Sequence, residues 1–320
     1  DGSWNGITID RIKDKLGTRE LPTAEIHLDG TLATLVGDPD HGVRRIAPML
    51  NVTRCWNAIC AVAHMRRCIE LACNFAQRRV AFGKPLIEQP LHAATLADMQ
   101  AQFEAAFHLA FHVASLLGRV ESGQASTGDA SLLRLLTPLP KLWTGKLAVS
   151  IASETIECFG GNGYIEDTGI PQLLRDAQVY PIWEGTTNVL ALDALGVIGR
   201  SGLQGLTVAI NAWLSEADTD AASAIRQSLA TAESWLARHA NEPAILQAGA
   251  RQLAVILACA TAAALLAQHA AWAKAEEHDT LPGIALARFI RLQPAQPLPD
   301  FSDAIALATD QASSNAALHG

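Results

Sequence analysis

Apolar and polar residues alternate near the start of the chain, and the spacing of the apolar residues then becomes helical. Residues 7–12 and 24–28 alternate as half-buried strands do, and the turn signal Asp29-Gly30 precedes a third predicted strand at 31–36. Beyond it the apolar residues recur with a period near 3.6, which predicts one long helix at 42–78. The chain therefore opens with strands and continues as helix.

Helical spacing persists through the rest of the chain. Two further long helices are predicted at 89–119 and 129–159, separated by a polar loop at 121–129. Long helices joined by short loops predict a four-helix bundle. The remaining helices are expected at 171–178, 185–198, 205–217, 219–240, 243–272, 282–291 and 302–317.

These elements divide the chain into three predicted domains. Residues 1–40 are interpreted as the end of a β-domain, 41–200 as the four-helix bundle, and 201–320 as a helical extension. The predicted fold class is therefore mainly α. Of the 320 residues, 49% are hydrophobic and only 5% are aromatic, which suits a core of small aliphatic side chains between closely packed helices.

The acidic charge argues against two classes of partner. The net charge is −8, and the extension at 201–320 holds six Lys and Arg against eleven Asp and Glu, a net charge of −5. Nucleic acids and anionic membrane surfaces are bound through clustered basic residues, so neither is expected as a partner. The apolar run at 252–268 is rich in alanine and has polar flanks, which favours a buried helix over a membrane span.

The six cysteines fall mostly inside apolar helical patterns and lack the spacing of metal ligands. This pattern is typical of buried free thiols in a reducing compartment. No signal peptide is recognisable, so secretion is not expected, and the bacterial cytoplasm and the mitochondrial matrix both fit. Because the first residue is Asp1, we expect either a processed or shortened chain or a first half that is carried elsewhere.

Residues 157–188 combine glycines with a carboxylate. The segment Gly160-Gly161-Asn162-Gly163 follows a predicted helix end, where glycine permits positive φ or the close approach of a ligand. Glu184 follows an apolar run that ends in Trp183, and apolar surroundings disfavour the charged form of a carboxyl, which suits a general base. Taken alone, the glycines are also typical of a helix C-cap, and the glutamate is typical of a helix N-terminus.

This stretch resembles the C-terminal signature of the acyl-CoA dehydrogenase family. The matching segments are FGGNGY, LLRDA and IWEGTTNV, in this order. In the family the glutamate of the EGT element removes the α-proton of an acyl-CoA, and Glu184 stands at that position. The resemblance implies an FAD-dependent oxidoreductase of fatty acid metabolism that dehydrogenates an acyl-CoA thioester to a trans-2-enoyl-CoA. The segments EQPLH and TPLPKLW and the long extension are most similar to the branch that contains the bacterial alkylation-response flavoproteins.

The resemblance also implies an FAD site shared between subunits, and hence a homodimer or homotetramer. In the segment at 79–83, Arg79 would meet the pyrophosphate and Phe82 the adenine end of FAD. Taken alone, this segment is a helix end with a cation and a glycine stop. Gly160 and Gly161 would contact the same FAD from the partner subunit. The implied cofactor-binding residues are Arg79, Phe82, Leu86, Gln89, Glu157, Gly160, Gly161, Thr186 and Asn188.

A second set of residues is implied for the acyl-CoA substrate. Arg54 matches a family arginine at the substrate pocket, although a surface arginine on a helix explains it equally well. Some family members carry their base one residue earlier. Thr53 stands there in this chain and cannot act as a base, which favours Glu184. The implied substrate-binding residues are Leu50, Asn51, Arg54, Trp183 and Gly185.

Partners and an alternative function follow from the same resemblance. Electrons would pass to an electron-transfer flavoprotein or a similar acceptor, and the family's N-terminal domains would come from outside this sequence. The alternative is a non-catalytic flavoprotein-like assembly or a DNA-protecting protein on the same fold, and the intact IWEGTTN segment favours the enzyme. His108 and His112 are spaced like a metal pair, but no third ligand completes a set, so they are interpreted as core or surface histidines.

Overall fold

The protein is mainly helical. The computed structural model describes residues 4–126, 128–293, 304 and 308. Strands in this part of the chain are confined to a hairpin near the N-terminus and to a second, very short hairpin. The predicted mainly α fold is confirmed.

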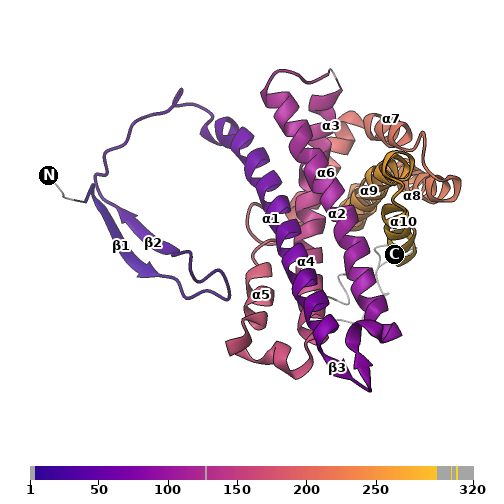
Figure 1. Ribbon diagram of the computed structural model, residues 1–320. Coiled ribbons are helices and arrows are strands. Elements are labelled where there is room, and N and C mark those ends of the chain that lie inside the picture. The colour runs from indigo at the N-terminus through magenta and orange to yellow at the C-terminus, as the bar shows by residue number, and fades with distance from the viewer. Residues whose placement is uncertain (1–3, 127, 294–303, 305–307, 309–320) are drawn as a thin grey trace, which may run out of the picture.

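Four helices form the bundle and lie side by side (Figure 1). The longest has 37 residues and spans about 55 Å at 1.5 Å per residue, so it runs the whole length of the bundle. The second starts on a proline, which is tolerated there because a backbone N–H in the first turn of a helix has no partner within the helix. The four are α1 (Gly42–Arg78), α2 (Pro90–Glu121), α4 (Pro138–Cys158) and α6 (Thr187–Ser201).

The N-terminal strands form a hairpin that projects to one side of the bundle (Figure 1). Strand β1 (Ile7–Ile12) pairs antiparallel with β2 (Ala24–Leu28), so both predicted strands are confirmed. The expected half-burial is wrong, because nearly all residues of both strands are exposed. The loop between them contacts α5 (Ile170–Ala177), where the Thr18 N–H donates a hydrogen bond to Asp176 Oδ1 at 2.5 Å. The hairpin is therefore connected to the bundle by a side-chain contact as well as by the chain itself.

The prediction of a third strand at 31–36 is wrong. Asn5 holds the backbone of Leu32 instead: its amide oxygen accepts from the Leu32 N–H at 2.9 Å, and its amide nitrogen donates to the Leu32 carbonyl oxygen at 2.8 Å. Val36 is 92% exposed. Alternating apolar residues form a strand only where another backbone pairs with them, and in the described chain none pairs with this segment.

The helix predicted at 129–159 is two helices. Helix α3 (Asp129–Leu136) ends before Thr137, and α4 begins at Pro138. Pro138 has no backbone N–H to donate to the carbonyl oxygen of Arg134, which interrupts the helical hydrogen bonds here, although Thr137 keeps helical φ and ψ angles of −51° and −45°. At the break, the buried Thr137 hydroxyl donates to the Leu133 carbonyl oxygen at 2.7 Å.

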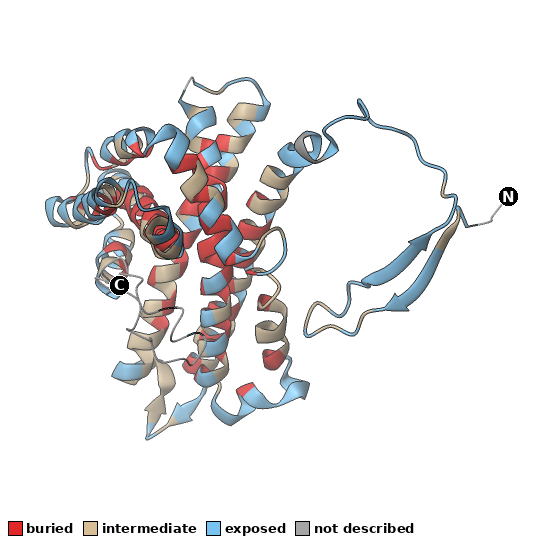
Figure 2. Cartoon of the chain, turned by 180° about the vertical axis from the view of Figure 1, so that it is seen from behind, coloured by how far each residue is buried: buried red, intermediate tan, exposed pale blue. Residues whose placement is uncertain are grey.

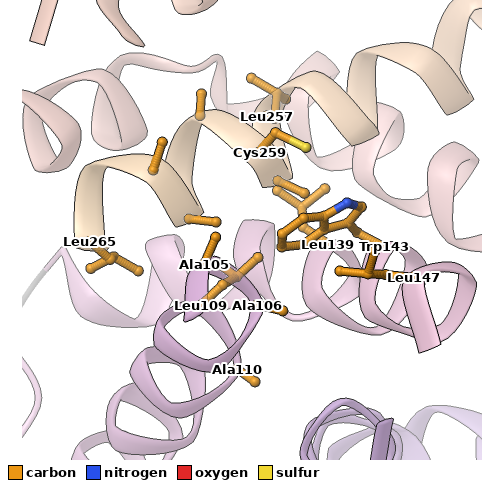
Figure 3. Packing of buried hydrophobic residues seen from close by; sticks show 14 of the residues in the cluster. Ala105, Ala106, Leu109, Ala110, Leu139, Trp143, Leu147, Leu257, Cys259 and Leu265 are labelled. Atoms are coloured by element: carbon orange, nitrogen blue, oxygen red, sulfur yellow. The ribbon is translucent and has the colours of Figure 1, made fainter. Parts of the chain in front are cut away.

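The helical extension packs onto the bundle. Its long helix lies against α2, α4 and α6, and one continuous hydrophobic core joins the bundle to the extension (Figure 2). Figure 3 shows Trp143 of α4 and Leu109 of α2 close to Cys259 of this long helix. The helix predicted at 302–317 lies outside the described residues apart from 304 and 308. Within the described residues, the extension consists of the helices α7 (Gln204–Trp213), α8 (Thr219–Arg238), α9 (Pro243–Trp272) and α10 (Leu281–Leu292).

Helix α9 is unusually apolar. The segment Pro243–Glu277 is long and apolar enough to cross a membrane, and α6 with α7 would be a second such span if that bent pair counted as one. Of the apolar window in the first segment, 72% is buried inside the protein. The prediction of a buried helix at 252–268 is therefore confirmed. Within the described chain all six cysteines are free thiols, and four of them are buried.

Short elements connect the long helices and present much of the candidate site. One is a hairpin between α1 and α2, and others follow α4. These elements are β3 (Val80–Ala81), β4 (Lys84–Pro85), the 3-10 turns Leu86–Glu88, Gly160–Tyr164 and Glu166–Thr168, and the π turn Ala273–Glu277.

Candidate active site

The loop between α5 and α6 carries Glu184 and packs closely on α4. Gly145 of α4 permits this approach, because a Cβ there would lie only 3.1 Å from backbone atoms of Tyr180 and Pro181. The Tyr180 ring also meets His64 of α1 edge-on, with ring centroids 5.6 Å apart. Packing on two helices therefore fixes the course of the loop before it reaches Glu184.

Glu184 and Gly185 have left-handed backbone conformations. The φ angle is 60° at Glu184 and 105° at Gly185. Positive φ is uncommon for a residue with a Cβ and persists where surrounding contacts hold it. Neither residue is helical, so α6 begins at Thr187, two residues after the predicted start. The Glu184 side chain is presented ahead of the helix and not within it.

A hydroxyl of α1 holds the Glu184 carboxylate. Thr53 Oγ1 donates a hydrogen bond to Glu184 Oε2 at 2.8 Å. Glu184 is half-buried, while the apolar side chains of Ile182, Trp183 and Trp56 are 60%, 52% and 63% exposed. A carboxylate that is oriented beside accessible apolar surface can accept a proton from an apolar molecule bound there.

Arg54, next to Thr53, lies in an ion-pair network with α3 and α6. Its Nη1 donates to Asp193 Oδ2 at 2.8 Å, and Arg134 donates to the other Asp193 oxygen at 2.5 Å. Burial would raise the pKa of Asp193, but hydrogen bonds and charges from Arg134 and Arg54 outweigh it and lower the pKa. Only 13% of the Arg54 side chain is exposed, so the interpretation as a surface arginine is wrong. Its role in substrate binding stays a prediction.

Lys141 of α4 is a member of this site that sequence reasoning missed. Its side chain is fully buried, and its Nζ donates a hydrogen bond to the Gly185 carbonyl oxygen. Burial lowers the pKa of Lys141 to about 8, Arg54 adds to the lowering, and Glu184 opposes it. The signal available was a lysine among apolar residues in TPLPKLW, because lysine is almost never fully buried without a partner.

Other predicted substrate and cofactor residues surround Glu184. Leu50 and Asn51 lie one turn before Arg54 on α1 and are half-buried, whereas Thr186 and Asn188 are exposed and flank the buried first residue of α6. One turn after Thr53, Asn57 of α1 is 2% exposed, and neither polar atom of its amide has a hydrogen-bond partner among the described residues.

Phe82 lies at the far end of α1, at the tip of the β3–β4 hairpin. Phe82 and Gly83 are its two turn residues, with φ angles of 51° and 84°. Two residues with positive φ are the pattern of a type I′ turn, in which the first position seldom holds an aromatic residue. The turn leaves Phe82 96% exposed. A large aromatic side chain is thus held away from the protein's own core.

Hydrogen bonds at the base of this hairpin hold it between α1 and α2. The Leu86 N–H donates to the Arg79 carbonyl oxygen at 2.9 Å, and Gln89 Nε2 donates to the Ala81 carbonyl oxygen at 3.0 Å. Arg79 is exposed, and Leu86 and Gln89 are half-buried. The Gln89 side chain therefore has a structural task, and its predicted contact with FAD stays a prediction.

The glycine loop after α4 is open to approach. Gly160 has a φ of 58°, and a Cβ on Gly161 would have no described atom within 4 Å. Gly163 differs, because a Cβ there would overlap the Ile156 carbonyl oxygen. Glu157, in the last turn of α4, is exposed. The packing of the chain thus requires glycine at 163 but not at 161.

The predicted site residues form two separate groups within one chain. Phe159 stacks on Phe75 with ring centroids 4.5 Å apart, so the glycine loop lies at the hairpin end of α1. Gly160 and Gly161 are therefore at the same end of α1 as Arg79 and Phe82, whereas the resemblance implied that these two pairs reach FAD from different subunits. The Glu184 group meets α1 at Thr53, 25 residues before the helix ends at Arg78. At 1.5 Å per residue, about 38 Å of helix separates the two groups.

The two histidines with metal-like spacing are engaged in ring contacts. His108 lies beside His269 of α9 with centroids 4.7 Å apart, and His112 meets Trp213 of α7 at 4.8 Å. Burial lowers the pKa of each to about 4. Across the described ranges, no group of three His, Cys, Asp or Glu residues could hold a metal ion.

Two protein-family models match the chain. Residues 40–198 match "Acyl-CoA dehydrogenase, C-terminal domain", and residues 206–317 match "Acyl-CoA dehydrogenase 11 C-terminal domain-like". The first match contains the bundle with Glu184, Thr53 and Lys141. The second contains the helical extension.

Similar proteins agree with these matches. Acyl-CoA dehydrogenase family member 11 of Caenorhabditis elegans is 51% identical over 208 residues, which are 65% of this chain and 33% of that protein. 3-Methylmercaptopropionyl-CoA dehydrogenase of Ruegeria pomeroyi is 32% identical over 196 residues, 58% of this chain and 33% of that protein. The crystal structure of Caenorhabditis elegans ACDH-11 in complex with C11-CoA superposes with a TM-score of 0.86 at 40% identity, covering 94% of this chain and 52% of that one. The chain thus spans about a third of these curated relatives and about half of the solved structure.

Proposed function

The chain belongs to the acyl-CoA dehydrogenase family, and on this premise we propose that it forms the helical part of an FAD-dependent oxidoreductase that converts an acyl-CoA thioester into a trans-2-enoyl-CoA. Glu184 is the base that accepts the α-proton. The observation that carries this proposal is the Glu184 carboxylate, which Thr53 orients on a left-handed loop beside accessible apolar surface. The solved relative in complex with C11-CoA supports an acyl-CoA as the ligand.

In the proposed reaction the chain binds and orients the thioester. The α-carbon lies against Glu184, which takes the α-proton, while the β-hydrogen leaves as a hydride and a double bond forms between the two carbons. Thr53 fixes one carboxylate oxygen, so the other faces the substrate. Trp183, Gly185, Leu50, Asn51 and Arg54 would line the acyl-CoA pocket. FAD, when bound, supplies the acceptor for the hydride.

The residues proposed to hold FAD fit a flat, anionic cofactor. Gly161 can let a ligand approach its backbone, since its missing side chain serves no packing in the described structure. Phe82 offers an exposed ring, and Arg79 offers a planar donor group suited to phosphate. Leu86, Gln89, Glu157 and Gly160 adjoin them. Thr186 and Asn188 would meet the cofactor near Glu184.

The distance between the two groups supports a cofactor site built from two copies of the chain. About 38 Å of α1 separates Thr53 from the hairpin end, which one bound cofactor is not expected to bridge within one subunit. The proposed assembly is a homodimer or homotetramer in which one copy contributes the hairpin group. The proposed acceptor is an electron-transfer flavoprotein or a similar protein, in the bacterial cytoplasm or the mitochondrial matrix.

The test is anaerobic titration of the FAD-loaded protein with a medium-chain acyl-CoA, followed by flavin absorbance. The wild type should bleach. Glu184→Gln keeps the shape and removes the base, so its flavin spectrum should persist without bleaching. Glu70→Gln, at an exposed position on α1, is the matched control and should bleach like the wild type. Bleaching of Glu184→Gln at the wild-type rate would overturn the assignment of the base.

A further inference from the structure

A fully buried lysine contacts the residue that directly follows the proposed base. Lys141 of α4 is 0% exposed, and its Nζ donates to the carbonyl oxygen of Gly185, the residue directly after Glu184. We propose that Lys141 is a positioning residue, which holds the Glu184 loop in its left-handed conformation through this hydrogen bond. Its effect on catalysis rests on the proposed function, whereas its effect on the loop does not.

The backbone of the loop explains why such a contact is needed. Glu184 has a φ of 60°, which costs free energy for a residue with a Cβ and persists where contacts from outside maintain it, whereas Gly185 adopts its positive φ freely. Thr53 holds the carboxylate and Lys141 holds the backbone, so Glu184 is fixed on both sides of its Cα. Burying an ammonium group costs free energy unless the group is paired. Here the Lys141 ammonium is paired with the carbonyl oxygen of Gly185, the residue after the proposed base.

The charges around Lys141 come from the loop that carries Glu184 and from three helices. Arg54 faces it from α1 and Glu184 faces it from the loop. Arg54 is itself paired with Asp193 of α6, which also binds Arg134 of α3. Glu184 is therefore the negative charge that favours the protonated form of Lys141. Loss of its proton would leave a neutral amine, a weaker donor to the Gly185 carbonyl oxygen.

The proton of Lys141 can be removed within an accessible pH range. Burial is the main cause that lowers the pKa of this group from the usual 10.5 to about 8. Below pH 8 the ammonium form holds the loop. Above it the folded protein contains the neutral amine, and the loop should loosen while the rest of the bundle is unchanged.

Hydrogen–deuterium exchange of the peptide at 178–187 tests the inference directly. In Lys141→Met this peptide should exchange faster than in the wild type at pH 7. In the wild type its protection, corrected for the intrinsic exchange rate, should fall as the pH passes about 8. Lys141→Arg keeps a charged donor and should stay protected over this range. Lys146→Met, at an exposed position on the same helix, should behave like the wild type.

Two outcomes would overturn the inference: equal protection of 178–187 in Lys141→Met and the wild type, or wild-type protection that does not change between pH 7 and 9. The second outcome is measured on the wild type, so it tests the inference even if Lys141→Met does not fold.

Turnover separates this inference from the proposed function. In the FAD-loaded protein, kcat of Lys141→Met should fall about 10- to 100-fold with a smaller change in KM, because a displaced base impairs the chemical step more than binding. Lys141→Arg should restore part of the loss and remove the decline above pH 8. A wild type that is inactive but shows the exchange differences would refute the dehydrogenase proposal and leave the positioning role. Full activity in Lys141→Met would overturn the effect of Lys141 on catalysis.

Discussion

Replacing Asp193 by asparagine should lower the free energy of unfolding by about 2 to 3 kcal/mol. The change keeps the shape of the side chain but removes the charge that Arg54 and Arg134 share. Breaking a buried ion pair costs about 3 to 5 kcal/mol, and an exposed pair contributes at most about 1 kcal/mol. The Arg54 side chain is 13% exposed and Arg134 is 42% exposed, so an intermediate value is expected. The loss corresponds to a fall in Tm of about 3 to 5 °C for a chain of 320 residues.

Thermal and urea unfolding followed by circular dichroism at pH 7 measure this loss. Glu166→Gln is the matched control, because it breaks an ion pair with Arg175 in which the glutamate is 69% exposed, and it should cost less than about 1 kcal/mol. Since the folded protein lowers the pKa of Asp193, its contribution is present above the ordinary aspartate range and is lost as the pH falls through the lowered pKa. The difference between Asp193→Asn and the wild type should therefore shrink toward pH 3. Equal losses in Asp193→Asn and Glu166→Gln at pH 7 would refute the reasoning.

Two further predictions concern the glycine loop and the buried histidines. Gly163→Ala should lower the free energy of unfolding, measured in urea, by about 1 to 3 kcal/mol, because its Cβ would overlap the Ile156 carbonyl oxygen. Gly161→Ala should change the free energy of unfolding by less than about 0.5 kcal/mol. It should instead weaken FAD binding in a fluorescence titration. His108 and His112 have pKa values lowered from 6.5 to about 4, so they bind protons more readily in the unfolded chain, and stability should fall as the pH drops from about 6.5 toward 4. Urea unfolding of a variant with leucine at both positions should depend less on pH over this range; an unchanged pH dependence would contradict the assignment.

The long helices could be predicted because their apolar spacing is continuous. The predictions at 42–78 and 243–272 agree with α1 and α9 at both ends. The strand predicted at 31–36 failed because a side chain 27 positions away, Asn5, takes the hydrogen bonds that a neighbouring strand would have made. The helix predicted at 129–159 is interrupted at Pro138 because the apolar periodicity continues on both sides of a residue that has no backbone N–H.

The candidate site could be predicted only in part. Glu184 stands in a recognisable sequence element, and so do the residues of the hairpin and the glycine loop. Lys141 stands in the recognisable segment TPLPKLW, but that resemblance assigns it no role, and Asp193 has no such segment around it. Their contacts join positions 44 and 139 residues apart, from α4 to the loop before α6 and from α1 to α6. Local spacing does not contain that information, although a lysine enclosed by apolar residues does indicate a buried charge with a partner.

The hydrogen bond between Thr53 and Glu184 has a consequence for how this fold can change over evolutionary time. The two side chains come from a helix and from a loop 131 positions further along, yet their oxygens are only 2.8 Å apart. A carboxylate introduced at position 53 could therefore reach the place that the Glu184 carboxylate now occupies. The proposed proton acceptor could thus stand in either of two distant stretches of the sequence while the carboxylate keeps its place in the fold. A comparison of distant relatives should for this reason align the location of the carboxylate in space before it aligns the residue in sequence.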